Sequence, residues 1–311
     1  MKTAELLASP VIVETPPAPT WLDLDLKARL SACASLTKPR IALMVLITVA
    51  IGYLLGAKGT IDAPRLFLTL LGTGLVAGGA SAWNMILERD RDALMRRTSG
   101  RPLPSGRLSL TEAVGFGTAI TLAGVATLAL GVNALAAGVA ATTFVLYVGV
   151  YTPLKSVTTL NTAIGAIPGA LPPAIGWAAA TGRLGVEPFS LFLIMFLWQF
   201  PHFLAIAWIY RDDYARGGHR MLPSVDPNGS MTGRQSMWHA LLLLPAGLIP
   251  WAIGLGGRWY FVGAFALGVY YLNYATRFWL DVNDKTARKL LRASFLYLPL
   301  VLLLLLLDRS A

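Results

Sequence analysis

Long uncharged apolar stretches recur along this 311-residue chain and constrain its fold more than any other feature. Each is about twenty residues long, the length that a helix needs to cross a hydrocarbon core of about 30 Å. They are continuous rather than alternating, and in lipid only helices and closed barrels satisfy their own backbone. The sequence therefore predicts an all-α polytopic membrane bundle of nine transmembrane helices, near residues 40–57, 66–87, 110–131, 133–151, 160–180, 188–209, 237–256, 259–279 and 289–307.

Composition supports a membrane protein with a short tail. Only 14% of the residues are charged, whereas soluble domains carry about 25%. The chain begins without a basic segment followed by an apolar core, so we expect no cleaved secretory signal. Residues 1–36 are expected to form a partly disordered N-terminal tail, and residues 37–311 the membrane domain. Cys33 is the one cysteine, which excludes a disulfide framework and a thiolate metal site.

The basic residues predict the orientation. Most of the 26 Lys and Arg residues fall in the tail and in the loops after the even-numbered spans. Because cytoplasmic loops carry an excess of Lys and Arg, we expect these segments to lie in the cytoplasm of a bacterium and the C-terminus in the periplasm. The protein would then be a multi-pass protein of the inner membrane. The net charge of +10 is explained by this topology and by anionic lipid head groups, and we expect no nucleic-acid partner.

Two acidic segments follow the second and sixth spans on the same predicted face. If the second span stays helical, Asn84, Glu88 and Asp92 share one side and Asp90 points elsewhere. Such oxygen ligands suit Mg²⁺ bound together with substrate phosphates, and arginines around them suit phosphate oxygens. One such loop would be interpreted as an ion-paired surface loop, but two favour a ligand that carries metal and phosphate. The acidic and amide residues concerned are Asn84, Glu88, Asp90, Asp92, Asp212 and Asp213.

The fifth and sixth spans carry further signals. Five residues, most of them polar, form a helical stripe along the sixth span that leads to its acidic end: Gln199, His202, Ile206, Tyr210 and Asp213. Polar side chains at that depth face a bundle interior or a cavity, although a hydrogen bond between helices is an equal alternative for His202. Prolines are expected to kink the fifth span, namely Pro168, Pro172 and Pro173.

Several stretches together resemble a known family. They are Leu-Thr-Lys-Pro-Arg at 36–40, the acidic and arginine-rich segment 84–106, residues 151–162, and the segment 198–223 that opens with Trp-Gln-Phe-Pro-His. Over residues 36–307 the chain is similar to the UbiA-type intramembrane prenyltransferases. The arginine-rich and Trp-Gln-x-Pro-His stretches point within them to the protohaem IX farnesyltransferases, or haem O synthases. Glu88 departs from the aspartate that the wider superfamily often has at its position.

The resemblance implies a fold and a reaction. The helices would surround a central cavity, and the enzyme would transfer the farnesyl group of farnesyl diphosphate to a vinyl group of haem b. The product, haem O, would serve terminal oxidases, and a downstream haem-modifying enzyme would be a possible partner. Mg²⁺ is the implied cofactor, held with the diphosphate by Asn84, Glu88, Asp90, Asp92, Asp212 and Asp213. Asp90, Asp92 and Asp213 would be the catalytic carboxylates.

The same resemblance suggests the substrate contacts. Arg40, Arg97 and Arg101 would stabilise the leaving diphosphate, and Lys155 and Asn161 would contact phosphate or a haem propionate. His202 would face the haem. Asn84, Gln199 and Tyr210 complete the expected substrate-binding set, and Tyr147, Tyr151 or Tyr210 would shield the allylic cation by cation–π contact.

Three other functions remain open from the residues alone. The first is the same transfer to another acceptor, such as a hydroxybenzoate or a chlorophyllide. The second is a transporter, although transporters gather their charges near the midplane and this chain gathers them at helix ends. The third is a factor that carries haem without chemistry. Mass analysis of the porphyrin product separates these functions.

Overall fold

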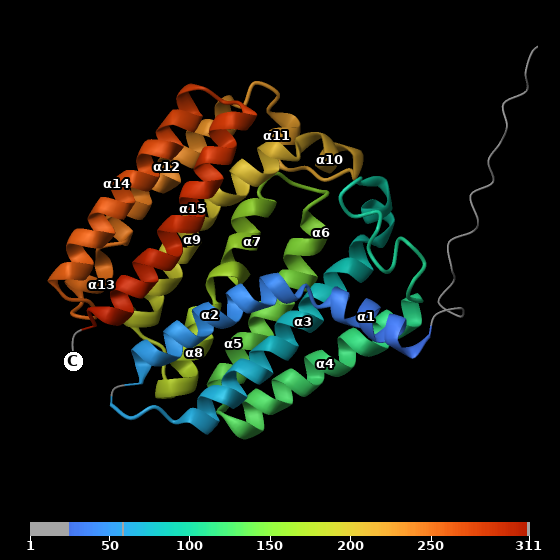
Figure 1. Ribbon diagram of the computed structural model, residues 1–311, viewed down its shortest axis with the longest axis horizontal. Coiled ribbons are helices and arrows are strands. Elements are labelled where there is room, and N and C mark those ends of the chain that lie inside the picture. Colours follow the sequence, from blue (N-terminus) through green and yellow to red (C-terminus); the bar gives the residue numbers. More distant parts are fainter. Residues whose placement is uncertain (1–24, 58, 310–311) are drawn as a thin grey trace, which may run out of the picture.

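The computed structural model describes residues 25–57 and 59–309, and their regular secondary structure is helical (Figure 1). The first half contains α1 (Leu26–Leu36), α2 (Pro39–Gly56), α3 (Ala63–Leu94), α4 (Leu110–Gly131), α5 (Ala134–Val145), the π-helical turn η2 (Leu146–Tyr151), α6 (Thr152–Leu154), α7 (Asn161–Ala170) and α8 (Pro172–Thr181). The second half contains α9 (Val186–Ile209), α10 (Arg211–Arg216), α11 (Leu222–Val225), α12 (Ser230–Ala246), α13 (Ile249–Ala252), α14 (Arg258–Leu280) and α15 (Asp284–Leu307).

The predicted all-α membrane fold is confirmed. Within the described residues, seven helical stretches are long and apolar enough to cross a membrane: Pro39–Gly56, Ala63–Leu94, Leu110–Gly131, Ala134–Leu154, Asn161–Thr181, Val186–Ile209 and Asp284–Leu307. The expected spans near 237–256 and 259–279 correspond to α12 with α13 and to α14, which lie outside this group. Helices therefore occupy all nine expected places, whereas the count of nine spans is not established.

Some predicted boundaries were wrong. The expected span 66–87 continues as α3 to Leu94, through the whole acidic segment. The expected span 289–307 begins five residues earlier, because Asn283 caps α15 by accepting backbone hydrogen bonds from Lys285 and Thr286. The expected span 237–256 is interrupted, since α12 ends at Ala246 directly after Pro245. Proline lacks the backbone N–H that would extend a helical hydrogen-bond ladder.

The predicted kink in the fifth span is confirmed. Helix α7 ends at Ala170, and Leu171 separates it from α8. Pro172 is the first residue of α8, the position where proline's fixed φ suits a helix and its missing N–H costs nothing. Before this break α7 packs mainly against α9, and after it α8 packs mainly against α2.

Small residues allow close packing in the first half of the bundle. A Cβ atom on Gly52 or Gly176 would collide with backbone of the other helix in the α2–α8 pair. In the same way, α3 approaches α4 where Gly79 faces Thr121. Such close backbone approach stabilises helix pairs in lipid, where apolar burial gives no driving force. The second half packs differently, around large side chains of α9, α12, α14 and α15.

Helix α1 belongs to the segment that we expected to be a partly disordered tail. Its first turn is capped by Asp25, whose side chain accepts a hydrogen bond from the Ala28 backbone N at 2.7 Å. Ala32 and Leu36 are buried with side chains of α3 and α4. The end of the tail is therefore an ordered helix that covers one end of the bundle. The rest of the tail, residues 1–24, lies outside the described residues.

The basic and acidic loops meet at one end of the bundle. Helix α1, the loop after α3, α10 and α11 all lie there (Figure 1). Arg211 of α10 forms an ion pair of 2.9 Å with Asp284 at the start of α15, which places the α14–α15 connection at this end as well. The grouping of loops predicted from charge is thus the grouping that the fold produces.

Candidate active site

The first acidic segment forms the floor of the candidate site. Because α3 remains helical to Leu94, Asn84, Glu88 and Asp92 lie on one face and are buried, with exposed fractions of 1%, 6% and 0%. The side chain of Asp90 points away, is 88% exposed and pairs with Arg89 at 3.2 Å. The spacing of these residues predicted both the shared face of Asn84, Glu88 and Asp92 and the different direction of Asp90.

Asn84 is held from two sides. Lys38 donates a hydrogen bond from Nζ to Asn84 Oδ1 at 2.9 Å, and Asn84 donates from Nδ2 to Thr152 Oγ1 at 3.2 Å. Lys38 links α1 to α2 with φ of 47°, a left-handed conformation that is uncommon for a residue with a Cβ. Burial, together with repulsion from Arg101 and Lys155, lowers the pKa of Lys38 to about 7. Sequence reasoning missed Lys38 as a site residue, although it lies in the 36–40 stretch that carried the resemblance.

Each buried carboxylate of α3 faces a cation from another segment. Lys155, after α6, lies 2.8 Å from Glu88 Oε1. Arg101, in the loop after α3, donates to Asp92 Oδ2 at 2.6 Å. Buried ion pairs recover their desolvation cost only with good geometry and further hydrogen bonds. This end of the bundle therefore concentrates opposite charges where water is largely excluded.

The second acidic segment is bound to the loop that follows the first. Asp213 of α10 is buried and accepts hydrogen bonds from the backbone N of Arg96 at 3.1 Å and of Arg97 at 3.3 Å. It also forms an ion pair with Arg216. Burial alone would raise the pKa of Asp213, but the hydrogen bonds from Arg216 and the two backbone groups outweigh it and lower the pKa. Asp213 is therefore a carboxylate that joins the two motifs, whereas Asp212 is exposed.

A cavity of about 450 Å³ opens beside Asp213. The Arg97 guanidinium lies 5.3 Å from the Tyr210 ring centroid and 5.6 Å from that of Tyr214. Among the described residues neither Arg96 nor Arg97 has an ion-pair partner for its guanidinium. The full lining is Arg96, Arg97, Ile209, Tyr210, Asp212, Asp213 and Arg216.

Aromatic and amide side chains form the border with the helices. The rings of Tyr147 and Tyr151 lie 5.5 Å apart, and the Lys155 ammonium lies 4.6 Å from the Tyr151 ring centroid. Asn161 is fully buried and donates to the carbonyl oxygens of Thr158 and Arg220 at 2.6 and 2.8 Å. Asn161 therefore fixes the loop backbone around Lys155 instead of presenting its amide to a ligand.

His219 is a second buried residue that sequence reasoning missed. Its Nδ1 has no hydrogen-bond partner within the described part of the chain. Burial is the main cause that lowers the pKa of His219 to about 4, and Glu88 opposes this shift. No periodicity marks His219, because it lies in the irregular segment between α10 and α11.

The polar side chains of the predicted stripe on α9 point toward two different helices. Gln199 donates from Nε2 to the carbonyl oxygens of Ala166 at 3.2 Å and of Met195 at 3.1 Å, which directs it toward α7. His202 instead lies 2.7 Å from Ser294 on α15, the hydrogen bond between helices that was the alternative for it. Of the remaining expected contacts, Arg40 is exposed at the start of α2.

The donor atoms fit part of a magnesium site. No group of three or more His, Cys, Asp or Glu side chains within residues 25–57 and 59–309 is close enough together to hold a metal ion. Oδ1 of Asp92, however, is buried and has no hydrogen-bond partner in that part of the chain. An anionic oxygen left without a partner costs free energy unless a cation or donor completes it. The oxygen atoms of Asn84, Glu88 and Asp92 suit Mg²⁺ whose remaining ligands are phosphate oxygens of the substrate.

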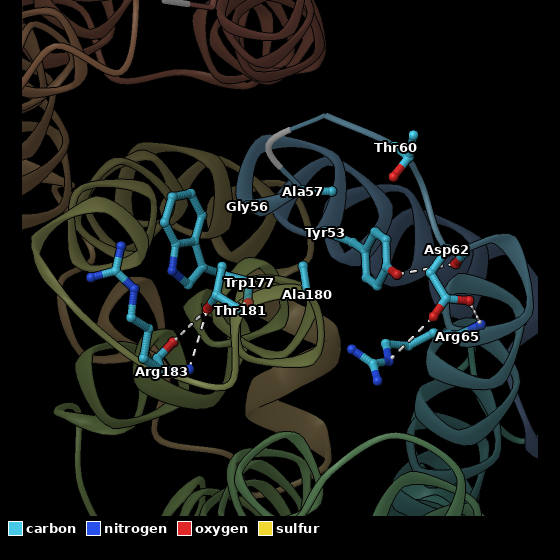
Figure 2. A pocket seen from close by; sticks show the side chains of 10 residues that line it. All are labelled: Tyr53, Gly56, Ala57, Thr60, Asp62, Arg65, Trp177, Ala180, Thr181 and Arg183. Carbon is cyan, nitrogen blue, oxygen red and sulfur yellow. Dashed lines mark hydrogen bonds and ion pairs between the residues drawn. The ribbon is translucent and has the colours of Figure 1, made fainter. Parts of the chain in front are cut away.

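A second cavity, of about 360 Å³ (Figure 2), lies at the end of the bundle opposite α10 and α11 (Figure 1). It is lined by the ends of α2 and α8 and the start of α3. Arg65 and Asp62 form an ion pair of 3.7 Å beside it. None of the predicted site residues lines this cavity, so the chemistry of the chain points to the acidic end.

Sequence comparison gives a consistent group of relatives. Protoheme IX farnesyltransferase of Solibacter usitatus is 48% identical over 283 residues, which cover 88% of this chain and 97% of that protein. Protoheme IX farnesyltransferase of Koribacter versatilis is 42% identical over 293 residues, 89% of this chain and 93% of the relative.

Solved structures share the fold at low identity. A digeranylgeranylglyceryl phosphate synthase superposes with a TM-score of 0.77 at 19% identity, covering 90% of this chain and 98% of the other. A UbiA homologue from Archaeoglobus fulgidus bound to GPP and Mg²⁺ superposes with a TM-score of 0.62 at 15% identity, covering 88% and 99%. The model of the UbiA prenyltransferase family matches residues 45–298. With this match across most of its length and these relatives, the chain belongs to the UbiA prenyltransferase family.

Proposed function

We propose that this protein transfers the farnesyl group of farnesyl diphosphate to a vinyl group of haem b, and that addition of water completes haem O. The relatives that match nearly the whole chain are protoheme IX farnesyltransferases, which supports this donor and acceptor. The observation that carries the proposal is the junction of the two acidic motifs, where Asp213 of α10 binds the backbone that follows α3.

The diphosphate would lie between the two motifs at this end of the bundle. Glu88 and Asp92 would hold Mg²⁺ from α3 together with Asn84, and Asp213 would hold it from α10. Asp90 of α3 and Asp212 of α10 are exposed and would take part through water. When bound, Mg²⁺ supplies a Lewis acid that stabilises negative charge on the phosphate oxygens.

The cations of the site would stabilise the leaving group. As the allylic C–O bond breaks, negative charge grows on the diphosphate, and fixed positive groups facing it lower the barrier. Lys38, Arg101 and Lys155 lie around the buried carboxylates, and Arg97 lies on the side of α10. Arg40 is exposed and would meet the diphosphate from outside.

Aromatic rings would protect the carbocation. The electrons of the C–O bond leave with the diphosphate, so C1 of the farnesyl group becomes cationic and reacts with any water present. Tyr147 and Tyr151 are packed together beside Lys155 and would stabilise the cation through their ring faces. A carbon–carbon bond to the haem vinyl group would then form, water would add at the other vinyl carbon, and one proton would be released.

The charge of the loops at the end of the bundle that holds the candidate site supports an orientation in the membrane. The loops that carry most Lys and Arg residues lie there with the candidate site (Figure 1), and such loops stay in the cytoplasm. We infer that the site faces the cytoplasm of a bacterial cell and that the farnesyl chain lies among the helices in the inner membrane.

Product analysis tests the function. Purified full-length protein is incubated with farnesyl diphosphate, haem b and Mg²⁺, and the porphyrin mass is measured. A gain equal to one farnesol is expected. Parallel reactions with a hydroxybenzoate or a chlorophyllide test other acceptors. Prenylation of either with unchanged haem would refute haem as the acceptor, and no prenylated product with any acceptor would refute the enzymatic function.

A further inference from the structure

His202 lies in a polar arrangement within the membrane that the diphosphate chemistry does not use. It is buried on α9, and its ring stacks on Trp198 with centroids 4.7 Å apart. The rings of Phe203 and Phe295 meet its ring edge-on, each at 5.2 Å, and both phenylalanines are exposed on the bundle surface. The imidazole is therefore held among aromatic side chains where α9 and α15 pack together.

Hydrogen bonding fixes the tautomer of this histidine. Ser294 Oγ lies 2.7 Å from His202 Nδ1 and 2.6 Å from the carbonyl oxygen of Leu291. A carbonyl oxygen only accepts hydrogen bonds, so the single hydroxyl proton of Ser294 is donated to Leu291. Ser294 must then accept the proton of Nδ1, which leaves the lone pair of His202 on Nε2.

The neighbouring contacts keep Ser294 in place. Trp198 donates from Nε1 to the carbonyl oxygen of Ser294 at 3.0 Å, so α9 and α15 are joined twice at this level. Among the described residues Nε2 of His202 has no hydrogen-bond partner. A histidine whose other ring nitrogen donates to an oxygen, with its ring orientation fixed by packing, is the usual arrangement of a metal ligand.

We propose that His202 Nε2 binds the iron of the acceptor haem and that Ser294 positions it by fixing the tautomer. This inference rests on the proposed function and adds how the acceptor is held. His202 lies seven residues before the end of α9 at Ile209, which is about 10 Å along the helix axis. The iron would lie deeper in the membrane than the diphosphate.

The chain contains a matched control. His239 of α12 also has a fixed tautomer, because its Nδ1 lies 2.7 Å from the carbonyl oxygen of Gln235. Its ring, however, is stacked on Phe200 at 3.7 Å between α9 and α12. His239 therefore shares the chemistry of His202 without its position.

Porphyrin titration of the full-length protein in detergent tests the inference. Haem b and metal-free protoporphyrin IX are each titrated into wild type, His202→Ala, Ser294→Ala and His239→Ala, and the absorption spectra are recorded. We expect His202→Ala to lose the spectrum of histidine-ligated iron and at least tenfold in haem affinity, and added imidazole to restore the spectrum. Ser294→Ala should weaken haem binding by about tenfold or more, as loss of an outer partner of a metal ligand does.

Three results would overturn the inference. They are an unchanged haem spectrum in His202→Ala, an equal loss of affinity for metal-free protoporphyrin IX, and a change in His239→Ala as large as that in His202→Ala. Activity separates this inference from the proposed function. If wild type farnesylates haem while His202→Ala keeps the iron spectrum, the iron ligand is wrong and the function stands. If wild type makes no prenylated haem, the function itself fails.

Discussion

Replacing Lys155 with Met should destabilise the protein strongly. The side chains of Lys155 and Glu88 are 13% and 7% exposed, with their charged atoms 2.8 Å apart. Removing one partner of a buried ion pair leaves an uncompensated charge and costs about 3–5 kcal/mol. For a chain of this size, such a loss lowers the unfolding temperature by roughly 5–15 °C. Tryptophan fluorescence during heating in detergent measures the change.

A second substitution shows whether the unpaired charge is the cause. In the double variant Lys155→Met with Glu88→Gln the carboxylate charge is also removed, so a large part of the lost stability should return. The exposed ion pair of Arg211 and Asp284, at 34% and 48% exposure, is the control, because such pairs contribute about 0–1 kcal/mol. A Lys155→Met variant as stable as wild type, or a double variant that loses the sum of the single effects, would refute the reasoning.

Four further predictions concern the site and the packing. Asp213→Asn should lower kcat by about 100-fold or more with normal membrane insertion, and wild-type turnover in this variant argues against the joined motifs. Chelation with EDTA should stop farnesyl transfer and added Mg²⁺ should restore it, so full activity in EDTA contradicts a metal site. Gly176→Ala should destabilise by about 1–3 kcal/mol, since its Cβ would collide with the carbonyl oxygen of Val49, whereas Gly138→Ala, with open space around it, should not. The pKa of His219 is about 4 in the folded protein and 6.5 in the unfolded chain, so lowering the pH from 6.5 to 4 favours unfolding by at most about 3 kcal/mol. The melting temperature should therefore fall over this pH range, and it should fall less in His219→Asn. An equal fall in wild type and His219→Asn contradicts the burial argument.

Much of the fold was predictable because the membrane imposes one requirement on the whole chain. Continuous apolar runs must be helical in lipid, and the break in the fifth span followed from Pro172, whose chemistry acts locally. The ends of α12 and α15 were predicted less well. The C-terminal end of α12 depends on Pro245, and the start of α15 depends on capping by Asn283. The pattern of apolar residues predicts neither.

The candidate site was predictable where its geometry is set by a helix. The positions of Asn84, Glu88 and Asp92 on one face follow from the spacing alone. Lys38 and His219 were missed because their positions depend on a left-handed residue and on an irregular segment. Local sequence does not fix how such segments fold back, since the contacts that hold them come from distant parts of the chain.

Under the proposed function, the length of α3 would set the level in the membrane at which the reaction takes place. Its 32 residues span about 48 Å, well beyond a hydrocarbon core of about 30 Å. Under the proposed function, the carboxylates at its end would therefore lie near the level of the lipid phosphates, where they would meet the diphosphate. The isoprenoid chain attached to that diphosphate would extend from this level into the hydrocarbon core. One uninterrupted helix would thus allow a single substrate to bind its diphosphate at the membrane surface and its tail in hydrocarbon, with the reacting bond at the boundary between them.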